Sequence, residues 1–105
     1  MNVKYLSSHA KKQYGLRKYN NINYYRSNPE IANEILENIK SSFRSSYSPR
    51  QFFKGNPKAG KRAKDIILFE NDDLLYAIRD NVLVTVLSVP EKDRISDFFL
   101  QLKNN

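Results

Sequence analysis

The sequence contains no cysteine and a single histidine among its 105 residues. The absence of cysteine excludes disulfides, thiolate chemistry and thiolate zinc sites, and one histidine with scattered acids argues against a zinc enzyme. No apolar run approaches the roughly 18–20 residues needed to span a bilayer, and residues 1–6 lack the apolar core of a signal peptide. We therefore expect a soluble cytoplasmic protein that uses no metal and no other cofactor.

Acidic residues are scarce in the first part of the chain. Residues 1–64 carry fourteen Lys or Arg against three acids, whereas residues 65–105 carry four basic residues against eight acids, and the whole chain has a net charge of +7. Cations that neutralise phosphates release counterions, so positive charge concentrated in one half favours a nucleic-acid partner.

The most basic segment, residues 41–64, contains no acid and is interspersed with aromatic residues, among them Phe43, Tyr47, Phe52 and Phe53. Unpaired bases stack on exposed aromatic rings, so this combination is typical of nucleic-acid binding. A solvated lysine-rich loop is the alternative interpretation. With two lysines of the first predicted helix, the predicted nucleic-acid-binding residues are Lys11, Lys12, Arg44, Arg50, Lys54, Lys58, Lys61, Arg62 and Lys64.

The N-terminal part of the chain predicts a short strand and a helix. Residues 2–6 fit the strand, and Ser7 or Ser8 can cap a helix over residues 9–19. The Asn20–Asn21 pair is a natural end for this helix.

An apolar stripe marks the second predicted helix. Ser27 and Glu30 have the spacing of a capping box, with a proline in the first turn. Apolar residues then recur at a spacing of four, which places them on one helix face that must pack on a sheet. They are Ile31, Ile35, Ile39 and Phe43, with Ala32 and Leu36 widening the stripe.

Residues 45–60 contain two prolines and two glycines and predict a long loop. Three apolar segments follow, and Asn and Asp residues mark the turns between them. The predicted strands are residues 65–69, 74–79 and 82–89, with turns at 71–73 and 80–81.

Residues 88–91 can cap a last helix, in which apolar residues recur at helical spacing. Its expected buried residues are Ile95, Phe98, Phe99 and Leu102. The expected fold is a single α+β domain over residues 1–105, with a basic loop at about 44–64. It has a short N-terminal strand, two helices, an antiparallel three- to four-stranded meander and a C-terminal helix.

His9 is the first candidate catalytic residue. Metal-free RNA cleavage needs a base for the ribose 2′-hydroxyl, an acid for the leaving 5′-oxygen and a cation for the transition state, and histidine is the usual proton-transfer residue near neutral pH. Arg17 lies roughly 12 Å further along the helix axis and about 80° around it. It can share a phosphate site with His9, although helix geometry does not require this, and His9 can equally be a surface or capping residue.

Thr85 is the second candidate, because its hydroxyl stands in the middle of the apolar segment 82–87. Such a hydroxyl can bind a phosphate from the face of the sheet. The alternative, which the residue pattern alone favours, is a β-branched strand residue whose hydroxyl bonds a neighbouring carbonyl.

The segment Leu6-Ser7-Ser8-His9-Ala10, with Arg17 eight residues after the histidine, resembles the opening of the barnase–EndoU–colicin–RelE-like (BECR) toxin superfamily. In several branches of that superfamily a helical pair and a β-meander follow, and the last core strand carries a segment similar to residues 82–86. The resemblance covers the order of elements over nearly the whole chain. It implies a metal-independent ribonuclease site made of His9, Arg17 and Thr85.

One position departs from this resemblance. Gln13 stands where a second arginine is frequent in such helices. Lys61, Arg62 or Lys64, just before the first meander strand, are alternative sources of the cation.

Three functions fit these observations. The first is a small endoribonuclease, toxin-type or phage-encoded, that cleaves tRNA or mRNA and is neutralised by an acidic antitoxin or immunity protein. The second is a non-catalytic RNA- or DNA-binding module, and the third is a protein-inhibiting relative of the same fold, as gyrase-poisoning toxins are. A catalytic site predicts that His9 and Thr85 converge beside the basic loop, whereas a binding module predicts exposed aromatic residues with His9 pointing elsewhere.

Overall fold

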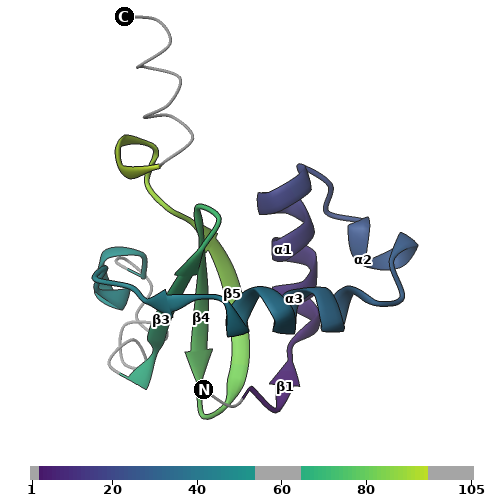
Figure 1. Ribbon diagram of the computed structural model, residues 1–105, viewed down its shortest axis with the longest axis horizontal. Coiled ribbons are helices and arrows are strands. Elements are labelled where there is room, and N and C mark those ends of the chain that lie inside the picture. The colour runs from purple at the N-terminus through teal and green to yellow at the C-terminus, as the bar shows by residue number, and fades with distance from the viewer. Residues whose placement is uncertain (1–2, 54–64, 95–105) are drawn as a thin grey trace, which may run out of the picture.

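A computed structural model describes residues 3–53 and 65–94 of the chain. The fold is α+β, as predicted: a strand and helices come first, and a β-meander follows (Figure 1). The elements are β1 (Tyr5–Leu6), α1 (Ser8–Tyr19), α2 (Tyr24–Ser27), α3 (Ile31–Lys40), β2 (Phe43–Arg44), the 3-10 turn η1 (Pro49–Gln51), β3 (Ile67–Asn71), β4 (Leu74–Arg79), β5 (Val82–Ser88) and the 3-10 turn η3 (Glu91–Asp93).

The strands form one mixed sheet in the order β1-β5-β4-β3-β2. The antiparallel β3-β4-β5 meander is confirmed, and the sheet is larger than expected because two-residue strands pair with each edge, β1 parallel to β5 and β2 antiparallel to β3. Both hairpin turns have two residues with positive φ: Asp72 and Asp73 at 52° and 63°, and Asp80 and Asn81 at 51° and 66°. Asn and Asp adopt this left-handed backbone readily, which is why the sequence located these turns correctly.

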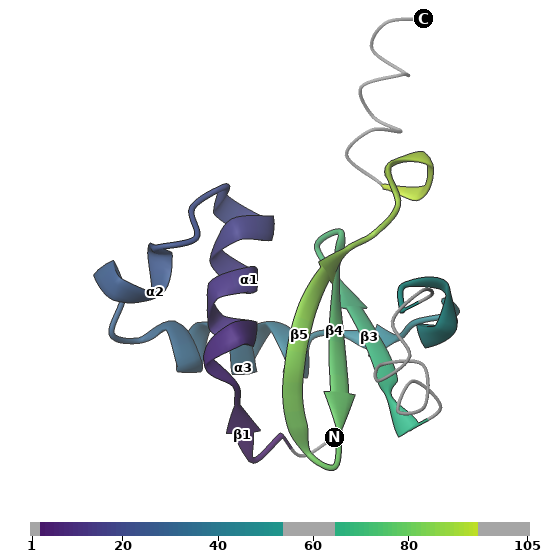
Figure 2. The same cartoon turned by 180° about the vertical axis from the view of Figure 1, so that it is seen from behind.

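Helices α1 and α3 pack against this sheet, and α2 packs on α1. Figures 1 and 2 show α3 lying across one face and α1 standing beside β5. The apolar stripe predicted for the second helix supplies much of the core, and it meets side chains from α1, β4 and β5. The core residues are Leu6, Ala10, Tyr14, Ile31, Ile35, Ile39, Leu74, Tyr76, Ile78, Leu83 and Val86.

Local hydrogen bonds define both ends of α1. The Ser7 hydroxyl accepts a hydrogen bond from the backbone N–H of Ala10 at 3.0 Å, so Ser7 is the N-cap. Asn20 ends the helix in the left-handed conformation, with φ of 53°. Gly15 allows the chain to turn back closely, since a Cβ at this position would lie 2.6 Å from the backbone oxygen of Asn21.

The start of α3 differs from the prediction. Ser27 does not cap this helix, because it is the last residue of the short helix α2 and its hydroxyl donates to the Tyr24 carbonyl at 3.1 Å. Glu30 is the N-cap without a side-chain hydrogen bond. Instead, the Asn28 side chain accepts from the Glu30 backbone N–H at 3.0 Å.

The prediction that Phe43 is buried is wrong. Helix α3 ends at Lys40, three residues before Phe43, and the chain then extends into β2, where the Phe43 side chain is 62 % exposed. Strand β3 also starts two residues later than predicted and takes in Asn71, which was expected in the turn. The buried positions predicted in the last helix (residues 95, 98, 99 and 102) lie outside the described residues, and residues 91–93 form η3.

Candidate active site

A β-bulge in β5 sets the direction of the candidate site residues on this strand. Thr85 lies opposite Ala77 and Leu83 opposite Ile78, so Val84 is an extra residue with no partner on β4. Residues three apart in a regular strand point to opposite faces, yet Leu83 and Val86 both lie in the core. The bulge therefore shifts the alternation of side-chain directions by one residue, so that the Thr85 side chain points away from the core face of the sheet.

Ser7 connects this bulge to the start of α1. Its backbone N–H donates to the Leu83 carbonyl at 3.1 Å, and its hydroxyl donates to the Val84 carbonyl, also at 3.1 Å. Because the same hydroxyl oxygen accepts from Ala10, one side chain fixes the first turn of α1 against the bulge. His9, in this first turn, is thereby held beside the strand that carries Thr85.

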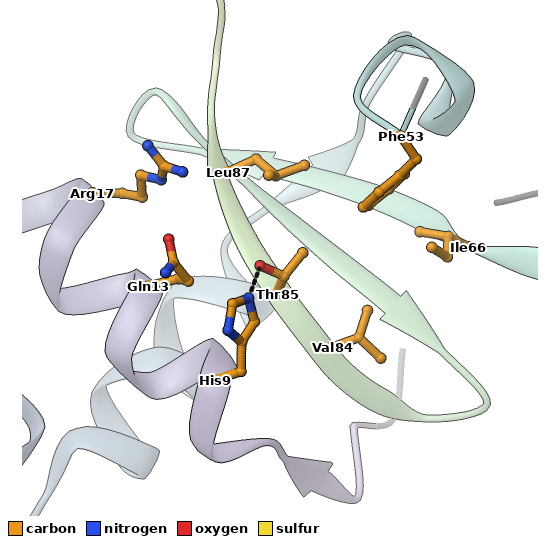
Figure 3. A pocket seen from close by; sticks show the side chains of 8 residues that line it. All are labelled: His9, Gln13, Arg17, Phe53, Ile66, Val84, Thr85 and Leu87. Carbon is orange, nitrogen blue, oxygen red and sulfur yellow. Dashed lines mark hydrogen bonds between the residues drawn. The ribbon is translucent and has the colours of Figure 1, made fainter. Parts of the chain in front are cut away.

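A pocket of about 450 Å³ opens between α1, β5 and the segment that follows η1. Figure 3 shows three side chains, His9, Gln13 and Arg17, directed from α1 towards β5. The lining residues are His9, Gln13, Arg17, Phe53, Ile66, Val84, Thr85 and Leu87.

His9 and Thr85 are in direct contact on the wall of this pocket. His9 Nε2 and Thr85 Oγ1 lie 3.1 Å apart and share a hydrogen bond, whose donor is set by the tautomer of the imidazole (Figure 3). His9 is exposed, whereas the Thr85 side chain is only 9 % exposed. A solvent-accessible imidazole beside a fixed hydroxyl is suited to proton transfer with a bound substrate.

Arg17 places its positive charge in the same pocket. His9, Gln13 and Arg17 are spaced four residues apart on α1, so they follow one face of the helix. The structure thus brings together the three residues predicted to be catalytic, His9, Arg17 and Thr85. The polar side chain of Gln13 lies between the histidine and the arginine.

The predicted nucleic-acid-binding residues that the structure describes lie elsewhere. Lys12 is exposed and approaches the Tyr25 ring, with its Nζ 5.7 Å from the ring centre, and Lys11 is half-buried. Arg44, on the edge strand β2, and Arg50, in η1, are both exposed. None of these four residues lines the pocket.

The remaining predicted binding residues, Lys54, Lys58, Lys61, Arg62 and Lys64, lie outside the described residues. Their role in binding nucleic acid stays a prediction.

A polar cluster behind the site holds α1 to the other helices. The Glu34 carboxylate accepts hydrogen bonds from the hydroxyl groups of Tyr14 at 2.5 Å, Tyr24 at 2.8 Å and Tyr19 at 3.1 Å. Burial by itself would raise the pKa of Glu34, but the tyrosine hydroxyls outweigh burial and hold this pKa below its ordinary value. Burial and the contact with Glu34 raise the pKa of Tyr14, so a neutral donor faces a charged acceptor.

Sequence reasoning identified Ser7 as a possible N-cap of α1, but not its contact with β5 and not the apolar part of the pocket lining. The periodicity of α1 contained a signal for Gln13, since it stands midway between His9 and Arg17 on one helix face. Ile66 and Leu87 had no such signal, because the tertiary fold brings them to the pocket from separate segments. Phe53 was marked only as one of the aromatic residues of the basic segment.

Within residues 3–53 and 65–94, no group of three His, Asp or Glu side chains is arranged to hold a metal ion. No helix in this part of the chain is long and apolar enough to cross a membrane. No family model, curated protein or solved structure matches the chain.

Proposed function

We propose that this protein is a small basic endoribonuclease that cleaves tRNA or mRNA without a metal ion, of the toxin type or encoded by a phage. The observation that carries the proposal is the 3.1 Å contact between His9 Nε2 and Thr85 Oγ1 in a pocket that also contains Arg17. The proposed site consists of the residues that the BECR-like sequence pattern implies, and the cytoplasm is the proposed location.

The geometry suits a phosphodiester of RNA. Two polar atoms about 3 Å apart can contact the ribose 2′-hydroxyl and an oxygen of the adjacent phosphate at the same time. The positive charge of Arg17, and the partial positive charge at the N-terminal turn of α1, favour the negative charge that develops on the phosphate.

In the proposed reaction His9 removes the proton from the ribose 2′-hydroxyl. The 2′-oxygen then forms a bond to phosphorus as the bond from phosphorus to the 5′-oxygen breaks, and the leaving oxygen takes a proton from solvent. Thr85 and Arg17 hold the phosphate oxygens. The products are a 2′,3′-cyclic phosphate and a 5′-hydroxyl.

Cleavage of total RNA in EDTA by the wild type and by His9→Ala tests this proposal. General acid–base catalysis contributes about 10²–10⁴-fold, so the variant should lose activity on that order. Because His9 is exposed, the circular dichroism spectrum and thermal unfolding of the His9→Ala variant should match those of the wild type. A substrate with a 2′-deoxy residue at the cut site should resist cleavage.

Full activity of His9→Ala would exclude the mechanism. RNA binding by the wild type without any cleavage would instead support a non-catalytic binding module. An acidic antitoxin or immunity protein is the proposed partner, since a chain with net charge +7 attracts an acidic surface.

A further inference from the structure

The pocket that contains His9 has two chemically different sides. The polar side consists of His9, Gln13 and Arg17 from α1 and the hydroxyl of Thr85. The opposite side is apolar, and Figure 3 shows Phe53 and Ile66 there, across the pocket from α1, with Leu87 between the two sides. A ligand that fits the whole pocket therefore needs an anionic part and an apolar part next to each other.

The aromatic ring of Phe53 is available to such a ligand. Its neighbour Phe52 packs edge-to-face on Tyr47, with 5.8 Å between the ring centres. Phe53 instead lines the pocket and remains partly exposed. An apolar ring that borders a cationic site is the arrangement on which a nucleobase stacks.

Hydrogen bonds within the described residues hold η1, the 3-10 turn that ends two residues before Phe53. Ser48 and Gln51 form a reciprocal capping box around η1, in which the Ser48 backbone N–H donates to the Gln51 side chain at 2.9 Å. The Tyr47 hydroxyl donates to the Asp93 carboxylate, which ties this turn to η3. These contacts therefore hold the backbone that leads to Phe53 before any ligand binds.

We propose that the apolar side of the pocket, with Phe53 as its main element, is a nucleobase subsite for the RNA nucleotide whose phosphate lies at His9 and Thr85. This inference rests on the proposed function, since it takes the polar side as the phosphate site. A pocket of about 450 Å³ lies within the range of about 300–1,000 Å³ that small-ligand sites occupy. Every base has a flat face, so Phe53 contributes affinity without selecting one base.

The chain contains no tryptophan, so Phe53→Trp introduces a unique fluorophore that keeps an aromatic face at this position. Phe43→Trp is the matched control, because Phe43 is an aromatic residue of the same basic segment, is 62 % exposed and lies outside the pocket. Adenosine 3′-monophosphate and uridine 3′-monophosphate should quench the tryptophan at position 53 saturably. Ribose 5-phosphate, which has no base, should not quench this fluorescence. None of the three compounds should quench the tryptophan at position 43.

Phe53→Ala provides the complementary measurement by calorimetry. It should weaken binding of both nucleotides by roughly 5- to 150-fold, the range that loss of one stacked aromatic residue produces. The affinity for ribose 5-phosphate should stay unchanged. Wild-type nucleotide affinity in Phe53→Ala, or an equal loss for nucleotides and ribose 5-phosphate, would overturn the subsite.

These outcomes are separable from the cleavage assay. Cleavage that depends on His9 in a protein whose nucleotide affinity does not depend on Phe53 would remove the subsite and leave the proposed function standing. Binding that depends on Phe53 without any cleavage would support the subsite and reject the nuclease.

Discussion

The Ser7 hydroxyl donates a 3.1 Å hydrogen bond to the carbonyl of Val84, a residue 77 positions away in the chain. Val84 is the extra residue of the β5 bulge, and Ser7 is the N-cap of α1. This contact holds the first turn of α1 against the bulge, where the side chains of β5 change the face to which they point. It thereby sets the distance between His9 and Thr85, although neither atom of the contact belongs to those two residues.

Ser7→Ala should weaken both the fold and the proposed activity. Loss of an N-cap costs about 0.5–2 kcal/mol in free energy of unfolding, and the Val84 carbonyl also loses its side-chain partner. Urea unfolding measures the first effect. The second should appear as a lower kcat with a nearly unchanged KM, because Ser7 positions His9 without lining the pocket.

Ser8→Ala is the control for this prediction, since Ser8 is the exposed neighbour at the same helix end. Equal stability and equal kcat in the two variants would show that the Ser7 contact has no positioning role.

Thr85→Val should lower cleavage by roughly 10²-fold, the effect typical of removing one hydrogen-bond donor from a transition-state site. Valine keeps the β-branched shape, so the strand and its pairing with Ala77 should be retained. Thr85→Ser, which keeps the hydroxyl, should recover most of the rate. Initial rates on one RNA substrate compare the three proteins, and equal rates for valine and threonine would remove the hydroxyl from the mechanism.

Stability should fall in acid because of the Glu34 cluster. The hydrogen bonds from the tyrosine hydroxyls hold the folded-state pKa of Glu34 below its ordinary value of 4.5. A depressed carboxyl pKa stabilises the fold above the ordinary value, and this contribution is lost as the pH falls through the folded-state pKa.

Glu34→Gln should therefore lower the free energy of unfolding near neutral pH by about 1–2 kcal/mol, a reduced value because the site is partly open to solvent. The difference from wild type should narrow below pH 4.5. Glu37→Gln, on the same helix but exposed, should change little at either pH. Urea unfolding of both variants and the wild type across a pH series measures these differences. If the free energy of unfolding of Glu34→Gln differed from wild type by the same amount at every pH, the depressed pKa of Glu34 would be contradicted.

Gly15→Ala should destabilise the protein, although alanine favours a helix by about 1 kcal/mol over glycine. The added Cβ would lie 2.6 Å from the Asn21 backbone oxygen and 2.7 Å from Tyr24 Cβ, closer than real Cβ contacts. Overpacking of this kind typically lowers the free energy of unfolding by about 1–3 kcal/mol. A higher melting temperature in Gly15→Ala than in the wild type would show that the turn after α1 shifts to accommodate the added Cβ at little cost in stability.

RNA binding should depend strongly on salt and on the basic segment. Each phosphate neutralised on a single strand contributes about −0.7 to the slope of log affinity against log salt. A triple reversal to Glu in the segment should weaken binding of any RNA sequence and flatten this slope. The reversed residues are Lys58, Lys61 and Arg62.

A second triple reversal, at exposed positions outside the segment, carries the same net charge and serves as the control. Its residues are Lys4, Arg26 and Lys40. If both triples weaken binding equally, net charge alone accounts for the affinity and the segment holds no specific site.

The sequence by itself determined the features that depend on near neighbours. The pairs Asp72–Asp73 and Asp80–Asn81 located both hairpin turns, because Asn and Asp tolerate positive φ wherever they stand. Ile31, Ile35 and Ile39 identified the buried face of α3 through the helical period alone. The same period placed Arg17 about 80° around α1 from His9, which allowed a shared site without requiring one.

The predictions for Ser27 and Phe43 were wrong because each residue belongs to an adjacent element, Ser27 to α2 and Phe43 to β2. Ser27 was predicted to cap the second helix and Phe43 to continue its apolar stripe, but Ser27 ends α2 and α3 ends at Lys40, before Phe43. A local sequence pattern does not determine to which of two adjacent elements a residue at their boundary will belong.

Only the tertiary structure decided how the site is assembled. A bulge exists only relative to a paired strand, so the direction of Thr85 followed from the register of β5 against β4 and not from residues 82–87. The contacts of Ser7 with Val84 and of His9 with Thr85 span 77 and 76 residues. Their geometry depends on the packing of α1 beside β5, which no local pattern specifies.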